Sequence, residues 1–180
     1  LHYSANPEIG NLTKTLDHES GFSLSNFVLR PQSTGSCHIS SADDRADPNI
    51  QANYLTHEED IQTTTHAIRF IYRLIKSQAL SPLVLSQAQP DLEQESDDTI
   101  IDWVRQTGLT SYHPIGTCKM GVDAHSVVDA ELKVRGISGL RIADASIMPT
   151  MPSSNTQAPS IMIGEKAADL ISTRYHALAW

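Results

Sequence analysis

The spacing of apolar residues predicts two helices in the middle of the chain. Thr56 followed by Glu59 has the form of a capping box, so a helix is expected to begin there and to end before Pro82. A second helix is expected from Ser96, whose hydroxyl suits a helix N-terminus, to Gly108. The apolar residues at helical spacing are Ile61, Ala67, Ile68, Ile71, Tyr72, Leu74 and Ile75 in the first helix and Ile100, Ile101, Trp103 and Val104 in the second.

Shorter apolar runs predict strands on both sides of these helices. Residues 21–40 alternate imperfectly, which predicts two strands around a turn between Pro31 and Gly35, followed by an ordered loop over residues 40–56. Three short strands are expected at residues 127–128, 132–134 and 140–143, the last of them buried. A closing helix is expected from Pro159. Its expected apolar side consists of Ile161, Met162, Ala168, Leu170 and Ile171.

Charge and composition exclude several classes of partner. The 180 residues include 13 Lys and Arg against 21 Asp and Glu, a net charge of −8 that repels nucleic acid and anionic membrane surfaces. No run approaches the roughly 18 apolar residues of a membrane span. The chain starts at Leu1 without an initiator Met, so we expect a piece of a longer protein, which we place in the cytoplasm. Its 39% hydrophobic content is low for a self-contained globule.

The histidines and cysteines do not form a recognisable metal or nucleophile motif. The eight histidines include no HExxH pair, and His113 with Cys118 lacks a second pair to complete a tetrahedral set, so no metal site is predicted. Cys37 and Cys118 are interpreted as ordinary thiols. The sequence also lacks a GxSxG elbow, a GxGxxG fingerprint and a Walker loop.

Two residues lie in loops that can aim a side chain. His113 is enclosed by Pro114 and Gly116, and Asn155 immediately precedes the expected closing helix. Taken locally, each also fits an ordinary structural role: His113 as a turn-capping residue and Asn155 as a helix cap or Asx turn.

Several runs in order resemble the glucose–methanol–choline (GMC) oxidoreductases, closest to their choline dehydrogenase and alcohol dehydrogenase-like members. They are YHPIGTCKMG at residues 112–121, GLRIADAS at 139–146, NT at 155–156 and IMIGEKAADL at 161–170. LRPQSTGS at 29–36 and DPNI at 47–50 also fit the family's substrate domain, so the similarity spans about residues 21–173.

This resemblance implies an FAD enzyme that transfers hydride from the carbinol carbon of a small-molecule alcohol to the flavin N5. His113 matches the family's catalytic histidine, which acts as the base, and Asn155 matches the second active-site position, where it would orient the alkoxide. Asp144 and Ala145 match residues near the flavin's ribityl and pyrophosphate groups. Asn155 and Thr156 match backbone placed against the isoalloxazine ring. No metal is implied.

The resemblance also implies an α+β fold, with helices packed on an antiparallel sheet. Residues 1–112 would be part of the substrate-binding domain. Residues 113–180 would be the active-site loop and a returning strand and helix that complete a Rossmann-like FAD domain. The N-terminal region that holds most of the FAD is absent from this chain, which alone is expected to be inactive and to expose apolar patches.

Two alternatives remain at this point. The chain could be a substrate-domain module that folds or forms a homo-oligomer without flavin or activity, or a small metal hydrolase built on its histidines.

Overall fold

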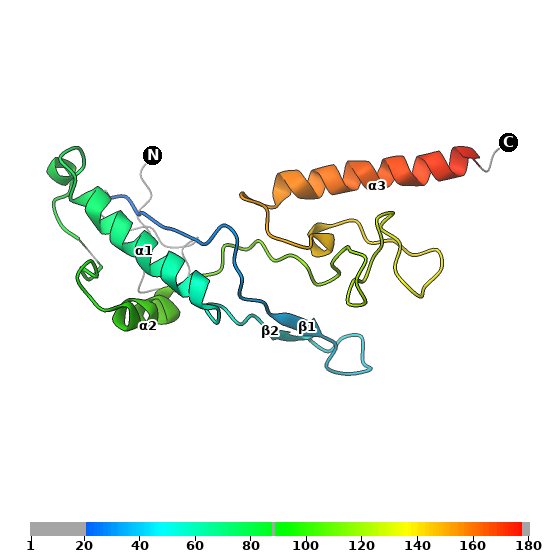
Figure 1. Ribbon diagram of the computed structural model, residues 1–180, viewed down its shortest axis with the longest axis horizontal. Coiled ribbons are helices and arrows are strands. Elements are labelled where there is room, and N and C mark those ends of the chain that lie inside the picture. Colours follow the sequence, from blue (N-terminus) through cyan, green and yellow to red (C-terminus); the bar gives the residue numbers. More distant parts are fainter. Residues whose placement is uncertain (1–20, 88, 178–180) are drawn as a thin grey trace. The chain divides into compact units, whose positions relative to one another are not determined.

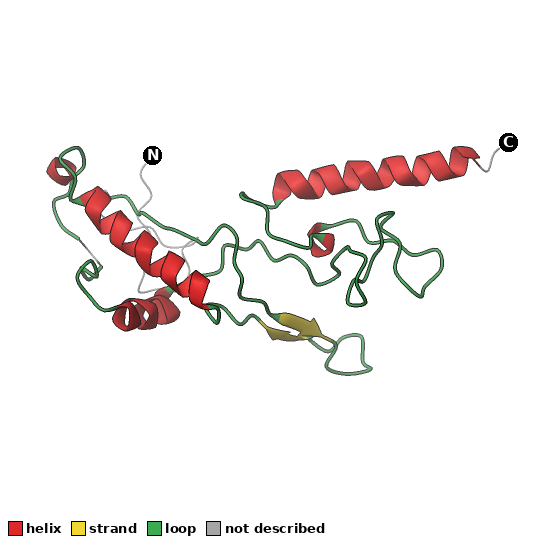
Figure 2. Cartoon of the chain, in the orientation of Figure 1, coloured by secondary structure: helices red, strands yellow, loops and turns green. Residues whose placement is uncertain are grey.

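The computed structural model describes residues 21–87 and 89–177, which contain α-helices and one antiparallel pair of short strands (Figures 1 and 2). In chain order the elements are β1 (Ser36–His38), β2 (Asn49–Gln51), α1 (Glu58–Ile75), the 3-10 helix η2 (Ser81–Leu83), α2 (Asp97–Thr107), the 3-10 helix η3 (Ala145–Ile147) and α3 (Gln157–Ala177). The described residues divide into two compact units, one of residues 21–28 with Leu55–Leu109 and one of Leu29–Tyr54 with residues 110–177.

The two helices of the first unit begin at side-chain caps. Ser96 caps α2 as predicted, because its hydroxyl accepts a hydrogen bond from the Thr99 amide at 3.2 Å, and the helix ends at Gly108. The cap predicted for α1 is one residue too early. The helix begins after His57, whose Nδ1 accepts from the Glu59 amide at 3.3 Å.

The core of the first unit joins α1 and α2 through the segment between them. Tyr72, Leu92 and Ile100 are buried together, and the Tyr72 hydroxyl donates to the carbonyl of Pro90. Lys76, just after α1, forms ion pairs at 2.7 Å with Asp91 and with Glu93. Apolar packing and charge therefore both hold residues 90–93 against the end of α1. The partly buried residues around this core are Ile68, Trp103 and Val104.

The strands of the second unit differ from those predicted. Of the two strands expected within residues 21–40, the first is absent and the second is present as β1. It pairs with β2, which lies within the stretch expected to be a loop. Cys37 lies opposite Ile50 in this antiparallel register. Both strands are exposed, so no apolar alternation marks them in the sequence. Gly35 permits their close approach, because a Cβ there would lie 2.2 Å from the carbonyl oxygen of Gln51.

A second core forms around η3 and the first half of α3. Its buried members are Val128, Leu132, Ile147, Met148, Ile163 and Ala167. The short strands predicted at 127–128, 132–134 and 140–143 are present only as isolated bridges, which join Val128 to Met120 and Val134, and Lys133 to Arg141. The predicted burial of residues 140–143 is wrong, since Leu140 is 46% exposed.

The apolar side predicted for α3 is also wrong in most of its members. Ile163 and Ala167, four residues apart, pack on the core with the half-buried Leu170, whereas Ile161 and Met162 are each 59% exposed. The other exposed members of the predicted side are Ala168 and Ile171. Helical spacing alone admits both faces, and contact with η3 selects the one that is buried.

Within residues 21–87 and 89–177, none of the helices combines the length and the hydrophobicity of a membrane-spanning segment. In the same residues, His, Cys, Asp and Glu side chains form no group of three or more that could hold a metal ion.

Candidate active site

The loop that carries His113 is anchored on both sides. Before it, the Thr110 hydroxyl accepts from the Tyr54 hydroxyl and from the Tyr112 amide, each at 3.2 Å. After it, the amides of Cys118 and Met120 donate to carbonyls of the η3 segment at 3.0 and 2.8 Å. Tyr112 adopts a positive φ of 60°, which is strained for a residue other than glycine. The backbone on either side therefore fixes the position of His113.

His113 lies against the beginning of α3. Its Nδ1 is 3.0 Å from the hydroxyl oxygen of Thr156, which is 43 residues away in sequence. Thr156 is buried and His113 is half-buried. The Thr156 carbonyl in turn accepts from the Ser160 amide at 3.0 Å and from the Ser160 hydroxyl at 2.7 Å. The structure thus brings together two of the residues that the sequence singled out.

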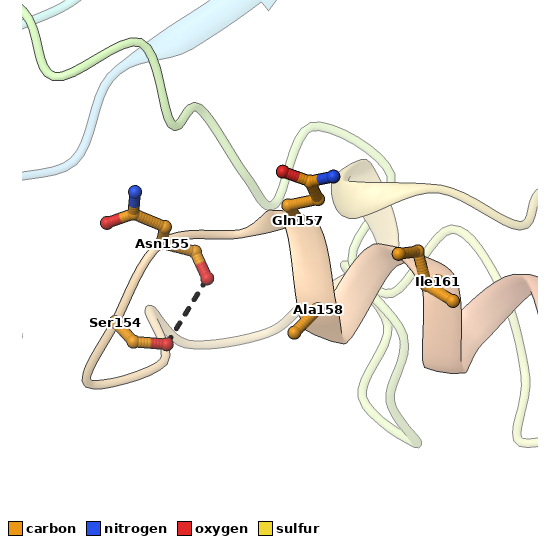
Figure 3. Close-up of a pocket in the computed structure, with 5 residues that line it drawn as sticks. All are labelled: Ser154, Asn155, Gln157, Ala158 and Ile161. Atoms are coloured by element: carbon orange, nitrogen blue, oxygen red, sulfur yellow. Dashed lines mark hydrogen bonds between the residues drawn. The ribbon is translucent and has the colours of Figure 1, made fainter.

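Asn155, next to Thr156, lies at an open pocket of about 440 Å³ at the start of α3 (Figure 3). The pocket is lined by Ser154, Asn155, Gln157, Ala158 and Ile161. Its wall combines the amide side chains of Asn155 and Gln157 with the apolar Ala158 and Ile161. The first turn of a helix leaves its leading amides without acceptors in the helix, so the Gln157 and Ala158 N–H groups are available here. They can donate to an acceptor atom, and the helix N-terminus favours negative charge.

Asp144 and Ala145 are held at η3. Asp144 caps this short helix, because its carboxylate accepts from the Ser146 amide at 2.7 Å, and Ala145 packs against the core. Backbone hydrogen bonds from the segment after His113 end at Ser146 and Ile147. Asp144 is thus joined to the His113 loop through η3 and shares a hydrogen bond with Ser146 rather than with His113.

The sequence did not reveal the contact that holds the loop before α3. The Arg30 guanidinium donates to the Ser153 hydroxyl from Nε at 3.1 Å and from Nη2 at 2.7 Å. These residues are 123 positions apart, so no local signal links them. The Thr156 side chain was missed in the same way, since only its backbone was assigned a role. The sequence also did not indicate Gln157, Ala158 and Ile161 as residues of a site.

Two carboxylates in the turns that follow the His113 segment are held in their charged form. The Ser126 hydroxyl and the His125 amide lower the pKa of Asp123 from 3.8 to about 2, with a smaller effect from Lys119. The Lys133 amide, more than that of Glu131, lowers the pKa of Asp129. Both carboxylates hold local turns through these hydrogen bonds, and neither lines the pocket.

Comparison with known proteins identifies the family. Residues 31–164 match the family model described as GMC oxidoreductase. The chain belongs to this family. It is 42% identical over 153 residues to an oxygen-dependent choline dehydrogenase from Escherichia coli, an alignment that covers 85% of this chain and 27% of that enzyme. This GMC chain therefore spans about a quarter of the length of the curated relatives it matches.

Solved structures agree with the GMC assignment. A variant of Aspergillus oryzae formate oxidase, studied for its FAD modification, superposes with a TM-score of 0.78 at 35% identity, over 84% of this chain and 27% of that one. An FAD-dependent oxidoreductase from Chaetomium thermophilum superposes with a TM-score of 0.76 at 27% identity, over 82% and 26%. The structural neighbours of this chain, which has helices and one antiparallel strand pair, are therefore GMC flavoenzymes.

Proposed function

We propose that this chain is the C-terminal, substrate-binding and catalytic portion of an FAD-dependent alcohol oxidoreductase of the choline dehydrogenase type. The observation that supports the proposal is the hydrogen bond between His113 and Thr156, which links the imidazole to the residue that follows Asn155 at the start of α3. The family membership supports an oxidoreductase, and the similarity to choline dehydrogenase supports an alcohol as the substrate.

The residues at the start of α3 fit a flavin. Their donor set consists of the Gln157 and Ala158 amides at a helix N-terminus, which suits the electron-rich carbonyl edge of a ring that gains negative charge on reduction. We assign Asn155 and Thr156 to hold the isoalloxazine ring through their backbone, and Asp144 with Ala145 to the ribityl and pyrophosphate groups. FAD, when bound, supplies the two-electron acceptor that takes hydride at N5.

The side chains of His113 and Asn155 have different roles toward the alcohol. His113 accepts the hydroxyl proton of the alcohol as the base, because a neutral imidazole has one unprotonated nitrogen that can take it. Asn155 can donate from its amide to the alkoxide oxygen but cannot take a proton, so it orients the substrate. The proton therefore ends on His113, and FAD, when bound, would supply the acceptor for the hydride of the same carbinol group.

The rest of the FAD site is assigned to an N-terminal region outside this chain. The relatives are about four times as long as the matched part, which leaves room for a nucleotide-binding region. The exposed apolar residues Ile161 and Met162 of α3, together with Leu140, give that region a surface to cover. In this arrangement residues 140–143 and α3 complete a Rossmann-like domain, and burial of these side chains would stabilise it.

The proposal is tested by replacing His113 in the flavin-loaded, full-length enzyme. We expect His113→Gln to lower the rate of flavin reduction by alcohol about 100-fold or more, because the base is lost while the side chain keeps a similar size. His66→Gln, at an exposed position of α1, is the matched control and should leave the rate unchanged. Flavin reduction at the wild-type rate in His113→Gln would reject His113 as the base. Absence of flavin from the wild-type protein would favour the flavin-free module instead.

A further inference from the structure

The hydroxyl of Thr156 is used differently from the other helix caps in the described residues. The Ser96 hydroxyl, the Asp144 carboxylate and the His57 ring each accept a hydrogen bond from a backbone amide in the turn they cap. Thr156 occupies the same position before α3, because the Ser160 amide donates to its carbonyl as the first bond of the helix. Among the described residues, however, the hydrogen bond of its hydroxyl oxygen is with His113.

Pro159 explains why this hydroxyl is available. A capping side chain accepts from the second or third amide of its helix, as Ser96 does from Thr99. The third residue of α3 is Pro159, which has no N–H. The third-position donor that occupies the Ser96 oxygen is therefore absent at Thr156, and the lone pairs of Thr156 Oγ1 can accept a hydrogen bond from a ring nitrogen.

We propose that Thr156 is a positioning residue that accepts a hydrogen bond from Nδ1–H of His113 and so keeps Nε2 of the neutral imidazole unprotonated. A neutral imidazole carries one proton, and the partner of one nitrogen decides which nitrogen holds it. The inference rests on the proposed function, in which His113 takes a proton from the alcohol. That proton goes to Nε2, and the hydrogen bond from Nδ1 to Thr156 is unchanged by the transfer.

The tautomer can be measured without flavin or substrate. We would label the histidines of the full 180-residue chain with 15N, record their ring nitrogen shifts and assign His113 by its loss in His113→Gln. In neutral His113 we expect a protonated Nδ1 and an unprotonated Nε2. A protonated Nε2 in the wild-type chain would overturn the proposal by itself, which keeps the test decisive even where a variant fails to fold.

Four variants separate the hydrogen bond from a general effect on the helix end. Thr156→Val keeps the shape without the acceptor and should shift His113 toward the Nε2–H tautomer, whereas Thr156→Ser should restore the wild-type shifts. Pro159→Ala restores a third amide that competes for Thr156 Oγ1, so it should shift His113 in the same direction as Thr156→Val. Ser160→Ala removes a neighbouring hydroxyl that donates to the Thr156 carbonyl rather than to its side chain, and should have no effect. Identical His113 shifts in wild type and Thr156→Val would contradict the proposal.

The same variants in the flavin-loaded, full-length enzyme distinguish this proposal from the function it rests on. Thr156→Val should lower the rate of flavin reduction about tenfold, as expected for one hydrogen bond that orients the base, while KM stays close to the wild-type value. Thr156→Ser should recover most of that loss. If the wild-type enzyme oxidises no alcohol, the proposed function fails. The tautomer measurement still decides whether Thr156 positions the imidazole.

Discussion

Asp123 holds a turn through contacts that are local in sequence. Its carboxylate accepts from the Ser126 hydroxyl at 2.8 Å and from the His125 amide at 2.9 Å, and it lies 3.3 Å from the Lys119 ammonium. These contacts favour the charged carboxylate and lower its pKa to about 2, and the Ser126 hydrogen bond has the largest effect. Because the folded-state pKa lies below the ordinary value, the contribution to stability is complete above about pH 4 and is lost as the pH falls toward 2.

We therefore expect Asp123→Asn to unfold at a lower urea concentration than wild type at pH 5, and the difference to shrink as the pH is lowered to 3. An amide does not titrate, so the variant lacks this part of the acid sensitivity. Urea denaturation, followed by circular dichroism at both pH values, measures the difference in unfolding midpoint between the variant and wild type. Asp44→Asn, at an exposed position in the loop between β1 and β2, is the control and should behave as wild type. A difference between Asp123→Asn and wild type that is equal at both pH values would contradict the assignment.

Among the elements, α2 packs on the core of the first unit through Ile100. Ile100 is fully buried between α1 and α2 and packs with Tyr72 and Leu92. Ile100→Ala should lower the free energy of unfolding by about 3 kcal/mol, since it removes buried methylenes and leaves a cavity. Leu85→Ala removes a side chain that is 99% exposed and should change the free energy of unfolding by less than about 0.5 kcal/mol. Equal losses in the two variants, measured by urea denaturation, would show that the α1–α2 core is not packed as described.

The helices could be predicted because their signals are local. The cap of α2 at Ser96 lies next to the helix it starts, and the apolar positions of α1 follow one another at helical spacing. Both helices are present. Of the two strands expected within residues 21–40, the second is present as β1, but its partner β2 could not be predicted, because it is three exposed residues that lie beyond a loop of ten residues without apolar alternation. The buried face of α3 likewise depends on η3, which no periodicity within α3 encodes.

For the whole molecule, the order of the motifs along the chain indicated the GMC family, and the matching family model confirms it. The motifs also named His113, Asn155 and Thr156 as candidate site residues, and the structure joins His113 to Thr156. The contacts that build the site could not be predicted. The Arg30 to Ser153 and His113 to Thr156 hydrogen bonds connect residues 123 and 43 positions apart, and only the folded chain brings them together.

The central claim is that this chain supplies the alcohol-oxidising site of a flavoenzyme. The most direct measurement is the visible absorbance spectrum of the chain purified with FAD, alone and after co-expression with the N-terminal region, before and after anaerobic addition of alcohol. The account predicts that the co-expressed sample retains oxidised flavin and that alcohol bleaches it. Retained flavin that no alcohol bleaches, or folded samples that retain no flavin at all, would contradict the account.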